Sequence, residues 1–542
     1  MPDTDPSVLI IGAGPVGLAL AVELARRQVR CRLIDKKTGP STHSKALGIF
    51  PRTLEVFEAM GVTGPVLDQG QHLHGGYFYQ NDRRVLELSF DTLPSPYSFV
   101  ISLPQNQTER ILLERLQALG GQVEWETELL GLEAGSQVIS ARMRRAGGQV
   151  ETAEFTWAAG CDGAHSTVRH QLGFEFQGKP YEQGFILADV AVRSQLRTDR
   201  LHAFFSQNGL LGYFPFKGDR GRFIMDDSMP PQGTGEKEPA EPSLDAIRSL
   251  VAERCPFPVE LTDAHWTSRF HVSHRMVKNF RRGNVFLAGD AAHIHSPAGG
   301  QGMNTGIQDA FNLGWKLAAV IKRRLHPDLL GTYAAERMPV ARDVLNLTDR
   351  LTRLAMLRGP WVDRARELLL PLVGVLPVRQ SAALRLSELE VNYRRRFGVN
   401  PITRPKVDAG DRAPDAELFV PASGQARRLF ELFRRDEYTL LGFSGPDVQA
   451  ARGSWTGLLE ALQPYRELVA PTFVSRSTNP AGPDPGAGGE TLLDRTGLAH
   501  QTYGIANPTA VLVRPDLYVA YRCTLDASSG LRSCLDRLRH GE

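Results

Sequence analysis

The stretch that decides the fold is residues 8–35, which read VLIIGAGPVGLALAVELARRQVRCRLID. Its first four residues are all apolar, as in a buried parallel strand. Glycines then stand at positions Gly12, Gly14 and Gly17, followed by a helix pattern and a second strand candidate that ends at Asp35. A strand, this glycine spacing, a helix and an acidic residue in this order predict a βαβ unit that binds a dinucleotide.

Each part of this motif has a physical task. We expect Gly12 to allow the tight turn, Gly14 to let backbone N–H groups approach a pyrophosphate, and Gly17 to let the helix lie close to the strand. The helix N-terminus directs its partial positive charge at the phosphates. Asp35 follows at the position of an acid that accepts hydrogen bonds from a ribose. The alternative is a glycine-rich turn without a ligand, and the pattern does not distinguish NAD from FAD.

The composition limits the class of protein. The chain has 542 residues, which predicts two to four domains at roughly 100–200 residues per domain. With 63 Lys+Arg and 60 Asp+Glu, the net charge is +3, and no basic block or acidic tail predicts a nucleic-acid partner. The five cysteines lie far apart without a CxxC pair, which argues against a disulfide framework and a structural zinc site.

An uncharged run at residues 6–22 resembles a signal peptide in composition. However, Asp3 and Asp5 precede it, whereas the start of a signal peptide is basic. Glu23 ends the run before it reaches the ~20 apolar residues that a spanning helix needs. We therefore predict no membrane partner, and the scattered cysteines fit a cytoplasmic protein in a reducing environment.

Two later motifs follow apolar strand candidates. CDGAHSTVR at 161–169 places Asp162 at a strand end, and VFLAGDAAHIHSPAGGQGMN at 285–304 delivers Asp290 to a loop. A helix pattern begins near Met303. Both acids have an alternative interpretation, because aspartate is common in turns and helix caps.

Together these motifs resemble the flavoprotein aromatic hydroxylases, the p-hydroxybenzoate hydroxylase-like single-component FAD monooxygenases. The stretch GGQGMNTGIQDAFNLGWKL at 299–317 matches this family, as does LPQNQTE at 103–109. Ser44-Lys45 followed by Arg52-Thr53-Leu54-Glu55 is similar to the branch with a C-terminal thioredoxin-like domain, which includes phenol hydroxylases. The resemblance runs nearly end to end.

The resemblance implies a set of residues that contact FAD. Lys45 stands where the family has an arginine that touches the pyrophosphate, and it keeps the charge but not the planar two-point geometry. Gln105 matches a glutamine that contacts the cofactor, and Asp162 matches an acid linked to FAD and nicotinamide binding. The ADP half of FAD is assigned to Gly12, Gly14, Gly17 and Asp35.

The same resemblance assigns the isoalloxazine half. Asp290 matches the acid that hydrogen-bonds the ribityl chain, and Pro297 matches a proline whose carbonyl lies close to flavin and substrate. A helix that starts near Met303 would point unpaired N–H groups at the negative charge of reduced flavin. The loop that meets the ring is assigned to Gly300, Gly302, Met303 and Asn304.

The family reaction implies the chemistry and the partners. NADPH or NADH reduces FAD, and O2 then forms a flavin C4a-hydroperoxide that hydroxylates a phenolic or polycyclic aromatic substrate. Such an enzyme needs a pocket that excludes water. Tyr213 is our candidate partner for a substrate hydroxyl, although a core position is the alternative. Some relatives have a catalytic aspartate where this chain has Leu47, so that base is absent.

The expected fold is α/β, with an FAD/NAD(P)-binding Rossmann-like domain, an inserted antiparallel β-sheet substrate domain and a C-terminal thioredoxin-like domain. The first part of the FAD domain is predicted at 1–182, the substrate sheet at 183–275, and the second FAD part with a helical segment at 276–395. The thioredoxin-like domain, at 396–542, has no CxxC for disulfide exchange and is expected to serve packing or a homodimer. Residues 477–490 are predicted to form a surface loop.

Several alternatives remain at this point. The same fold supports FAD oxidases, reductases and halogenases, although a WxWxIP signature is absent, and a non-catalytic flavin-binding protein is a further alternative. His293 and His295 have no third ligand nearby in the sequence, so no metal is expected. Asp309, Asn312 and Lys316 are expected to serve helix packing and its exposed face.

Overall fold

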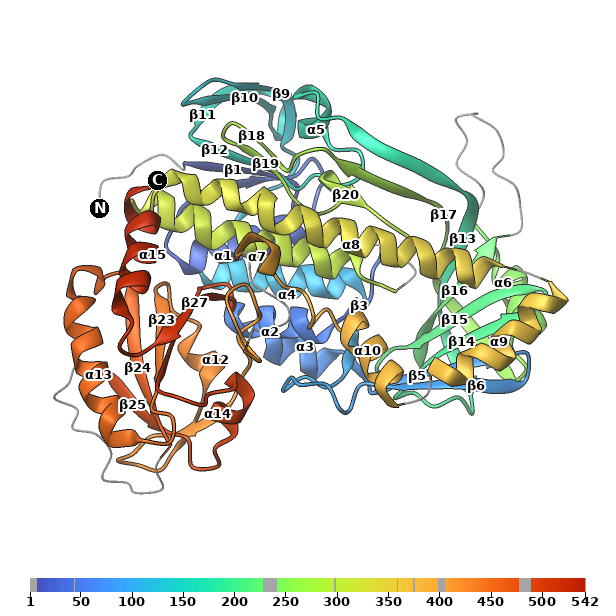
Figure 1. The fold of residues 1–542 in the computed structure, drawn as a ribbon. Helices are drawn as coiled ribbons and strands as arrows, with labels where there is room; N and C mark the ends of the chain where they lie inside the picture. Colours follow the sequence, from blue (N-terminus) through green and yellow to red (C-terminus); the bar gives the residue numbers. More distant parts are fainter. Residues whose placement is uncertain are drawn as a thin grey trace.

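A computed structural model gives the fold (Figure 1). It describes residues 7–42, 44–227, 241–296, 299–357, 359–373, 376–397, 405–476 and 489–541. Two predictions from the sequence lie outside these residues, namely the position of Pro297 and the loop conformation of residues 477–488.

A six-stranded sheet of order β18–β19–β12–β1–β2–β8 contains the glycine motif. All strands except β18 run parallel, which agrees with the predicted α/β class. Helices α1 (Pro15–Arg26) and α7 (Gly302–Ile321) pack against one another beside this sheet. The strands are β1 (Val8–Ile11), β2 (Cys31–Ile34), β8 (Val123–Glu124), β12 (Trp157–Gly160), β18 (Arg281–Arg282) and β19 (Val285–Leu287).

A second, eight-stranded sheet has the order β20–β17–β13–β16–β15–β14–β5–β6. Only the pair β14–β5 is parallel, and the other neighbours are antiparallel. One face packs on α6 (Leu244–Arg254) over a core of its own. Strands β5 and β6 precede the segment predicted to form this sheet. The strands are β5 (Gly75–Gln80), β6 (Arg83–Ser89), β13 (Phe176–Ser194), β14 (Leu201–Ser206), β15 (Gly209–Pro215), β16 (Arg220–Asp227), β17 (Val259–Val277) and β20 (His293–Ile294).

Three consecutive helices connect the parts of the molecule. Figure 1 shows the long helix α8 (Gly331–Met356) running from the region of α7 toward the eight-stranded sheet. Helix α9 (Pro360–Val373) then packs on β5 and β6, and α10 (Leu376–Leu386) contacts α9 and β6. Helices α9 and α10 therefore cover the β5–β6 end of the eight-stranded sheet, whereas α8 contacts β15 and β17.

The C-terminal region forms a seven-stranded sheet of order β22–β21–β25–β24–β23–β26–β27. Its centre is parallel across β23, β24 and β25, whereas β26 and β27 are antiparallel. The thioredoxin-like description of this domain stays a prediction. Its elements are β21 (Glu417–Phe419), β22 (Ala426–Arg428), α12 (Leu429–Leu432), β23 (Tyr438–Phe443), α13 (Val448–Ala461), β24 (Val469–Ser475), β25 (Glu490–Leu493), α14 (Leu498–Tyr503), β26 (Thr509–Val513), β27 (Val519–Thr524) and α15 (Ser528–His540).

Smaller elements complete the fold. Two three-stranded sheets have the orders β3–β7–β4 and β11–β10–β9. None of the helices within the described ranges combines the length and apolarity needed to cross a membrane. The remaining helices and strands are β3 (Gly48–Ile49), α2 (Pro51–Met60), α3 (Thr63–Gln69), β4 (Gln71–Leu73), β7 (Val100–Ser102), α4 (Gln105–Ala118), β9 (Glu128–Ala134), β10 (Ile139–Arg144), β11 (Val150–Phe155), α5 (Thr167–Gln171) and α11 (Arg394–Phe397).

Candidate active site

One cavity of about 2500 Å³ extends from the glycine turn of β1 to the space between the eight-stranded sheet and helices α8–α10. Ligand pockets measure roughly 300–1,000 Å³, so this cavity has room for a dinucleotide and a second ligand. Gly17, Asn304 and Tyr213 are not among its lining residues. The predicted site residues that line it are Gly12, Gly14, Asp35, Lys45, Gln105, Asp162, Asp290, Gly300, Gly302 and Met303.

The three glycines of the first motif have different surroundings. Gly12 has φ +100°, and a Cβ there would lie 2.5 Å from the carbonyl oxygen of Cys161. A Cβ on Gly17 would lie 1.8 Å from the carbonyl oxygen of Gly12, so Gly17 permits the close approach of α1 to the turn. A Cβ on Gly14 would meet no heavy atom within 4 Å, because this glycine faces the cavity. The turn therefore leaves the backbone beside Gly14 open to a ligand.

Asp35 directly follows β2 and stabilises the same turn. Its Oδ2 accepts a hydrogen bond from the N–H of Ala13 at 2.8 Å, and its Oδ1 accepts one from the N–H of Lys37 at 2.9 Å. A carboxylate has about four acceptor positions, so two remain for ligand hydroxyl groups at the cavity wall. This arrangement fits the predicted contact with a ribose.

Asp162 follows β12 and has an unsatisfied acceptor. Its Oδ2 accepts a hydrogen bond from the N–H of Val168 at 3.2 Å, while its buried Oδ1 has no partner among the described residues. Burial raises the pKa of the Asp162 carboxyl. Since buried acceptors are almost always paired, this atom at the cavity wall fits a donor group of a bound ligand.

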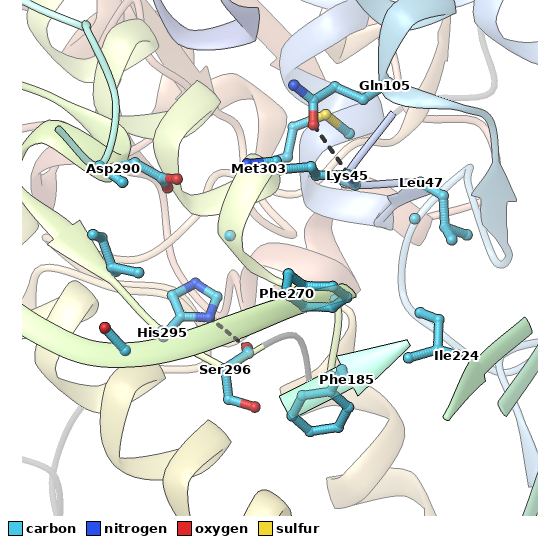
Figure 2. A pocket seen from close by; sticks show the side chains of 18 of the residues that line it. Lys45, Leu47, Gln105, Phe185, Ile224, Phe270, Asp290, His295, Ser296 and Met303 are labelled. Carbon is cyan, nitrogen blue, oxygen red and sulfur yellow. Dashed lines mark hydrogen bonds between the residues drawn. The ribbon is translucent and has the colours of Figure 1, made fainter. Parts of the chain in front are cut away.

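Asp290 lies in the short turn Gly289–Ala291 after β19 and extends into the cavity (Figure 2). Its carboxylate is open to this cavity. Burial raises the pKa of this carboxyl, and the electrostatic influence of the nearby His293 and Lys45 opposes the rise. A carboxylate that is open to the cavity in this way fits the hydroxyl groups of a ribityl chain.

The N-terminus of α7 lies beside Asp290 at the cavity wall. Gly299 and Gly300, with φ +91° and +65°, lead into the helix without side chains, and Gln301 provides no side-chain cap. The N–H groups of the first turn therefore have no intrahelical partner and carry the positive end of the helix dipole. Met303 lines the cavity at this point. The geometry fits the predicted stabilisation of an anionic flavin ring.

The side chain of Asn304 bonds within the protein, and the role predicted by resemblance, which concerns the backbone of this loop, stays a prediction. Its Oδ1 accepts a hydrogen bond from the N–H of Phe50 at 2.9 Å, and its Nδ2 donates to the carbonyl oxygens of Gly48 (2.8 Å) and Gly300 (3.0 Å). The side chain is fully buried and does not line the cavity. The Asn304 side chain thus holds the loop around the N-terminus of α7 in place.

Lys45 and Gln105 lie at the opposite wall of the cavity (Figure 2). The amide of Gln105 is already paired, because its Oε1 accepts from the N–H of Ala46 at 3.0 Å and its Nε2 donates to Glu109 at 2.9 Å. The carbonyl oxygen of Lys45 accepts a hydrogen bond from Arg222 at 2.9 Å. Gln105 and Arg222 therefore hold the backbone that presents the Lys45 side chain to the cavity.

The structure does not support the predicted role of Tyr213. On β15, Gly212 and Phe214 line the cavity, whereas Tyr213 points to the opposite face because side chains alternate along a strand. There its ring stacks on Phe223, with the ring centroids 4.7 Å apart. Leu47, in contrast, lines the cavity as an apolar residue.

His295 lines the cavity, whereas the sequence analysis weighed this residue only as a metal ligand. Its Nδ1 is 2.9 Å from the carbonyl oxygen of Ser296, and its Nε2 is buried without a partner among the described residues. Burial lowers the pKa of His295 to about 4, so the ring is neutral at neutral pH. No group of three potential metal ligands exists in the described ranges. Only the three-dimensional position of the ring reveals it as a site residue.

Aromatic and aliphatic side chains form the far part of the cavity. Figure 2 shows Phe185, Ile224 and Phe270 around the space that Asp290 and His295 also face. The three apolar residues come from neighbouring strands β13, β16 and β17 of the eight-stranded sheet. A polar dinucleotide region and an apolar chamber are therefore continuous.

Comparisons with known proteins agree with this geometry. Residues 5–348 match the FAD binding domain family, and residues 407–539 match the family described as aromatic-ring hydroxylase, C-terminal. The residues that line the polar part of the cavity all lie within the first of these regions.

Similar proteins cover the whole chain. Pentachlorophenol 4-monooxygenase of Sphingobium chlorophenolicum is 34% identical over 98% of this chain and 97% of its own length. The 6-methylpretetramide 4-monooxygenase of Streptomyces rimosus is 33% identical over 99% of this chain and 94% of its own length. The solved structure of the anhydrotetracycline hydroxylase OxyS from Streptomyces rimosus superimposes with a TM-score of 0.75 at 28% identity, covering 99% of both chains. The chain therefore belongs to the FAD-dependent aromatic-ring monooxygenases.

Proposed function

We propose that this protein uses NADPH or NADH and O2 to hydroxylate a phenolic or polycyclic aromatic substrate. The observation that carries the proposal is the continuity of one cavity from the Gly14 turn, past Asp290, to the apolar chamber around Phe270. When bound, FAD supplies the redox chemistry that activates O2 for transfer of one oxygen atom to the ring.

The residues that hold FAD follow the cavity wall. Gly12, Gly14 and Asp35 receive the ADP half, and Lys45 supplies a positive charge for the pyrophosphate. Asp290 accepts hydrogen bonds from the ribityl chain. The first-turn N–H groups of α7 stabilise negative charge on the pyrimidine side of the ring.

The apolar chamber receives the aromatic substrate. Phe185, Ile224 and Phe270 would exclude water from the space in which the substrate ring and the flavin meet. His295, in place of Tyr213, is the candidate hydrogen-bonding group for a substrate hydroxyl, because its Nε2 is unpaired and its ring faces the cavity. Two relatives are named for such substrates, one for the phenol pentachlorophenol and one for 6-methylpretetramide, and these names support a phenolic or polycyclic aromatic substrate.

Three finer assignments remain predictions of this proposal. They are the cytoplasmic location, a homodimer formed through the C-terminal domain, and the thioredoxin-like topology of that domain. The choice between NADPH and NADH is likewise decided by experiment.

The direct test uses the purified full-length chain. After its flavin absorbance is recorded, NADPH and NADH oxidation and O2 uptake are measured across a panel of phenols and polycyclic aromatics. We expect substrate-stimulated oxidation and a product whose mass has increased by one oxygen atom. Hydrogen peroxide as the sole product with every ring would instead support an oxidase or reductase, and a halogenated product would support a halogenase.

A site variant tests the cofactor assignment separately. Asp290→Ala is expected to lose FAD while the fold is retained, since the carboxylate faces the cavity rather than the core. Flavin content and far-UV circular dichroism measure the two properties. Normal FAD occupancy in this variant would overturn the assignment of Asp290.

A further inference from the structure

Charged and polar side chains form a buried network between the cavity and the C-terminal domain. The sequence predicted that Asp309, Asn312 and Lys316 serve helix packing and its exposed face. The structure agrees with packing, but an exposed face was wrong, because each residue is at most 1% exposed. The C-terminal domain and α8 cover that face of α7. We call the set the interdomain network, and its members are Asp309, Asn312, Lys316, Glu336, Arg337, Tyr393, Arg514 and Asp516.

At the cavity end, Asp309 fixes the turn that carries Asp290. Its Oδ2 accepts a hydrogen bond from the backbone N–H of Gly289 at 3.2 Å and lies 2.7 Å from Nε2 of His293. Its Oδ1 accepts from Nε of Arg337 at 2.7 Å. The backbone directly before Asp290 is therefore held by a carboxylate that belongs to α7.

At the other end, a turn of the C-terminal domain inserts between α7 and α8. Arg514 donates two hydrogen bonds to Glu336, at 2.7 and 2.8 Å, and a third to Oδ1 of Asp516 at 2.8 Å. Asn312 donates to Oδ2 of Asp516 at 3.1 Å. Lys316 completes this end with a 2.7 Å hydrogen bond to Glu336. These contacts thus join the C-terminal domain to both α7 and α8.

The hydroxyl of Tyr393 joins the two ends. Its oxygen accepts from Nη1 of Arg337 and from Nδ2 of Asn312, both at 3.3 Å. Hydrogen bonds therefore run without a gap from Asp516, through Asn312, Tyr393 and Arg337, to the Asp309 carboxylate. Removing one charged partner from a buried network leaves an uncompensated charge, so its neighbours must rearrange.

We propose that Asp516 of the C-terminal domain is a positioning residue for FAD, acting through this network on the turn that presents Asp290. The inference rests on the proposed FAD site and gives the C-terminal domain a task in cofactor binding. Arg514 orients the Asp516 carboxylate by a hydrogen bond. Asp309 links α7 to the turn before Asp290, because its carboxylate accepts a hydrogen bond from the N–H of Gly289.

The test measures the dissociation constant of FAD for the full-length apoprotein by flavin fluorescence. We expect Asp516→Asn to weaken FAD binding by roughly fivefold or more, within the range of coupled contacts. The matched control is Glu490→Gln, which also removes one negative charge from the C-terminal domain. Glu490 pairs with Arg427 and Arg435 outside the network and is not a cavity residue, so its variant should bind FAD as the wild type does.

A double-mutant cycle tests whether Asp516 acts through Asp309. If it does, the loss of affinity in Asp309→Asn/Asp516→Asn is smaller than the product of the two single losses. Visible circular dichroism of bound flavin should change in the same way in both single variants, because both alter the surroundings of the ribityl chain. The proposal is overturned if the loss of FAD affinity in the double variant equals the product of the two single losses. It is also overturned if folded Asp516→Asn has the dissociation constant of the wild type.

Tyr393→Phe keeps the test decisive if Asp516→Asn does not fold. This variant removes only the bridging hydroxyl and adds no charge, and it is expected to weaken FAD binding in the same direction. Wild-type affinity in Tyr393→Phe would contradict a connected network. If the wild-type chain itself binds no FAD, the proposed function fails as well, whereas equal binding by the wild type and all variants contradicts only the role of Asp516.

Discussion

Arg222 and Asp189 form a two-point ion pair between neighbouring strands of the eight-stranded sheet. Nε and Nη2 of Arg222 donate to the two carboxylate oxygens of Asp189 at 2.6 and 2.8 Å. The third guanidinium nitrogen reaches the Lys45 carbonyl oxygen, so this one side chain ties the substrate sheet to the loop at the cofactor end of the cavity. Both members of the pair are buried.

Arg222→Met is expected to be strongly destabilising. It leaves the buried Asp189 carboxylate without its partner, which costs about 3–5 kcal/mol in comparable pairs. Urea denaturation of wild type and variant measures the free energy of unfolding. As a control, Arg197→Met breaks an exposed pair with Asp199 and should change stability by less than about 1 kcal/mol. Equal effects in the two variants would contradict the importance of burial here.

Gly14→Ala and Gly17→Ala are expected to fail in different ways. Gly14 has a φ of −75° and open space at its Cβ position, so its alanine variant should fold normally and lose FAD affinity as the methyl group enters the ligand space. Gly17→Ala places a methyl group 1.8 Å from a backbone oxygen and should lower stability by about 1–3 kcal/mol or more. Thermal unfolding of the apoproteins and FAD titration separate the two outcomes. A destabilised Gly14→Ala with unchanged FAD binding would contradict the prediction.

Tyr213→Phe is expected to leave turnover unchanged. The ring of Tyr213 packs on the face of the sheet away from the cavity, so its hydroxyl does not contact the substrate. Phe214→Ala, one position along the strand, removes cavity-lining area and should lower kcat/KM by roughly tenfold. Steady-state kinetics with an identified substrate measures both. A large loss of kcat/KM in Tyr213→Phe without any loss of stability would support the original prediction that Tyr213 contacts the substrate.

Glu388→Gln is expected to alter the pH dependence of stability. Burial raises the pKa of Glu388 to about 8, so the folded protein holds this proton between the ordinary pKa near 4.5 and pH 8, whereas the unfolded chain releases it. The stability provided by the protonated group is present below pH 4.5 and is lost as the pH rises to 8, by roughly 1.4 kcal/mol per unit of pKa shift. The variant cannot ionise and should lose less stability than the wild type over this window.

Denaturation curves at pH 5, 7 and 9 check this prediction. The matched control is Glu390→Gln, because Glu390 is an exposed glutamate two residues away. Its variant should follow the wild-type pH profile. Parallel profiles for wild type and Glu388→Gln would mean that Glu388 is ionised in the folded state.

The features that the sequence predicted well are local. Residues 8–35 contain the strand, turn, helix and acid of one compact βαβ unit, so neighbours in sequence are neighbours in space. Asp162 and Asp290 follow buried parallel strands of the same sheet, and the carboxyl ends of such strands meet at one edge. The position of the polar site therefore followed from short-range patterns.

The features that the sequence missed depend on distant partners. Whether Tyr213 or Phe214 faces the cavity is decided by strand register, which shifts every side chain to the other face when it moves by one residue. The burial of Asn312 and Lys316 depends on a turn at Asp516, about 200 residues away, that no periodicity within α7 can indicate. His295 became a site residue only through the fold of the loop before α7.

The parallel pairing of β5 with β14 joins strands that are synthesised at different times during translation. Leu201 pairs with Gly76, about 125 residues earlier, so at ~5–20 residues per second the β5–β6 hairpin waits roughly 6–25 s for its neighbour. An isolated hairpin is only marginally stable in water, and its apolar face is unprotected during this interval. Nascent chains that end between residues 90 and 200 therefore contain β5 and β6 without the neighbouring strand β14.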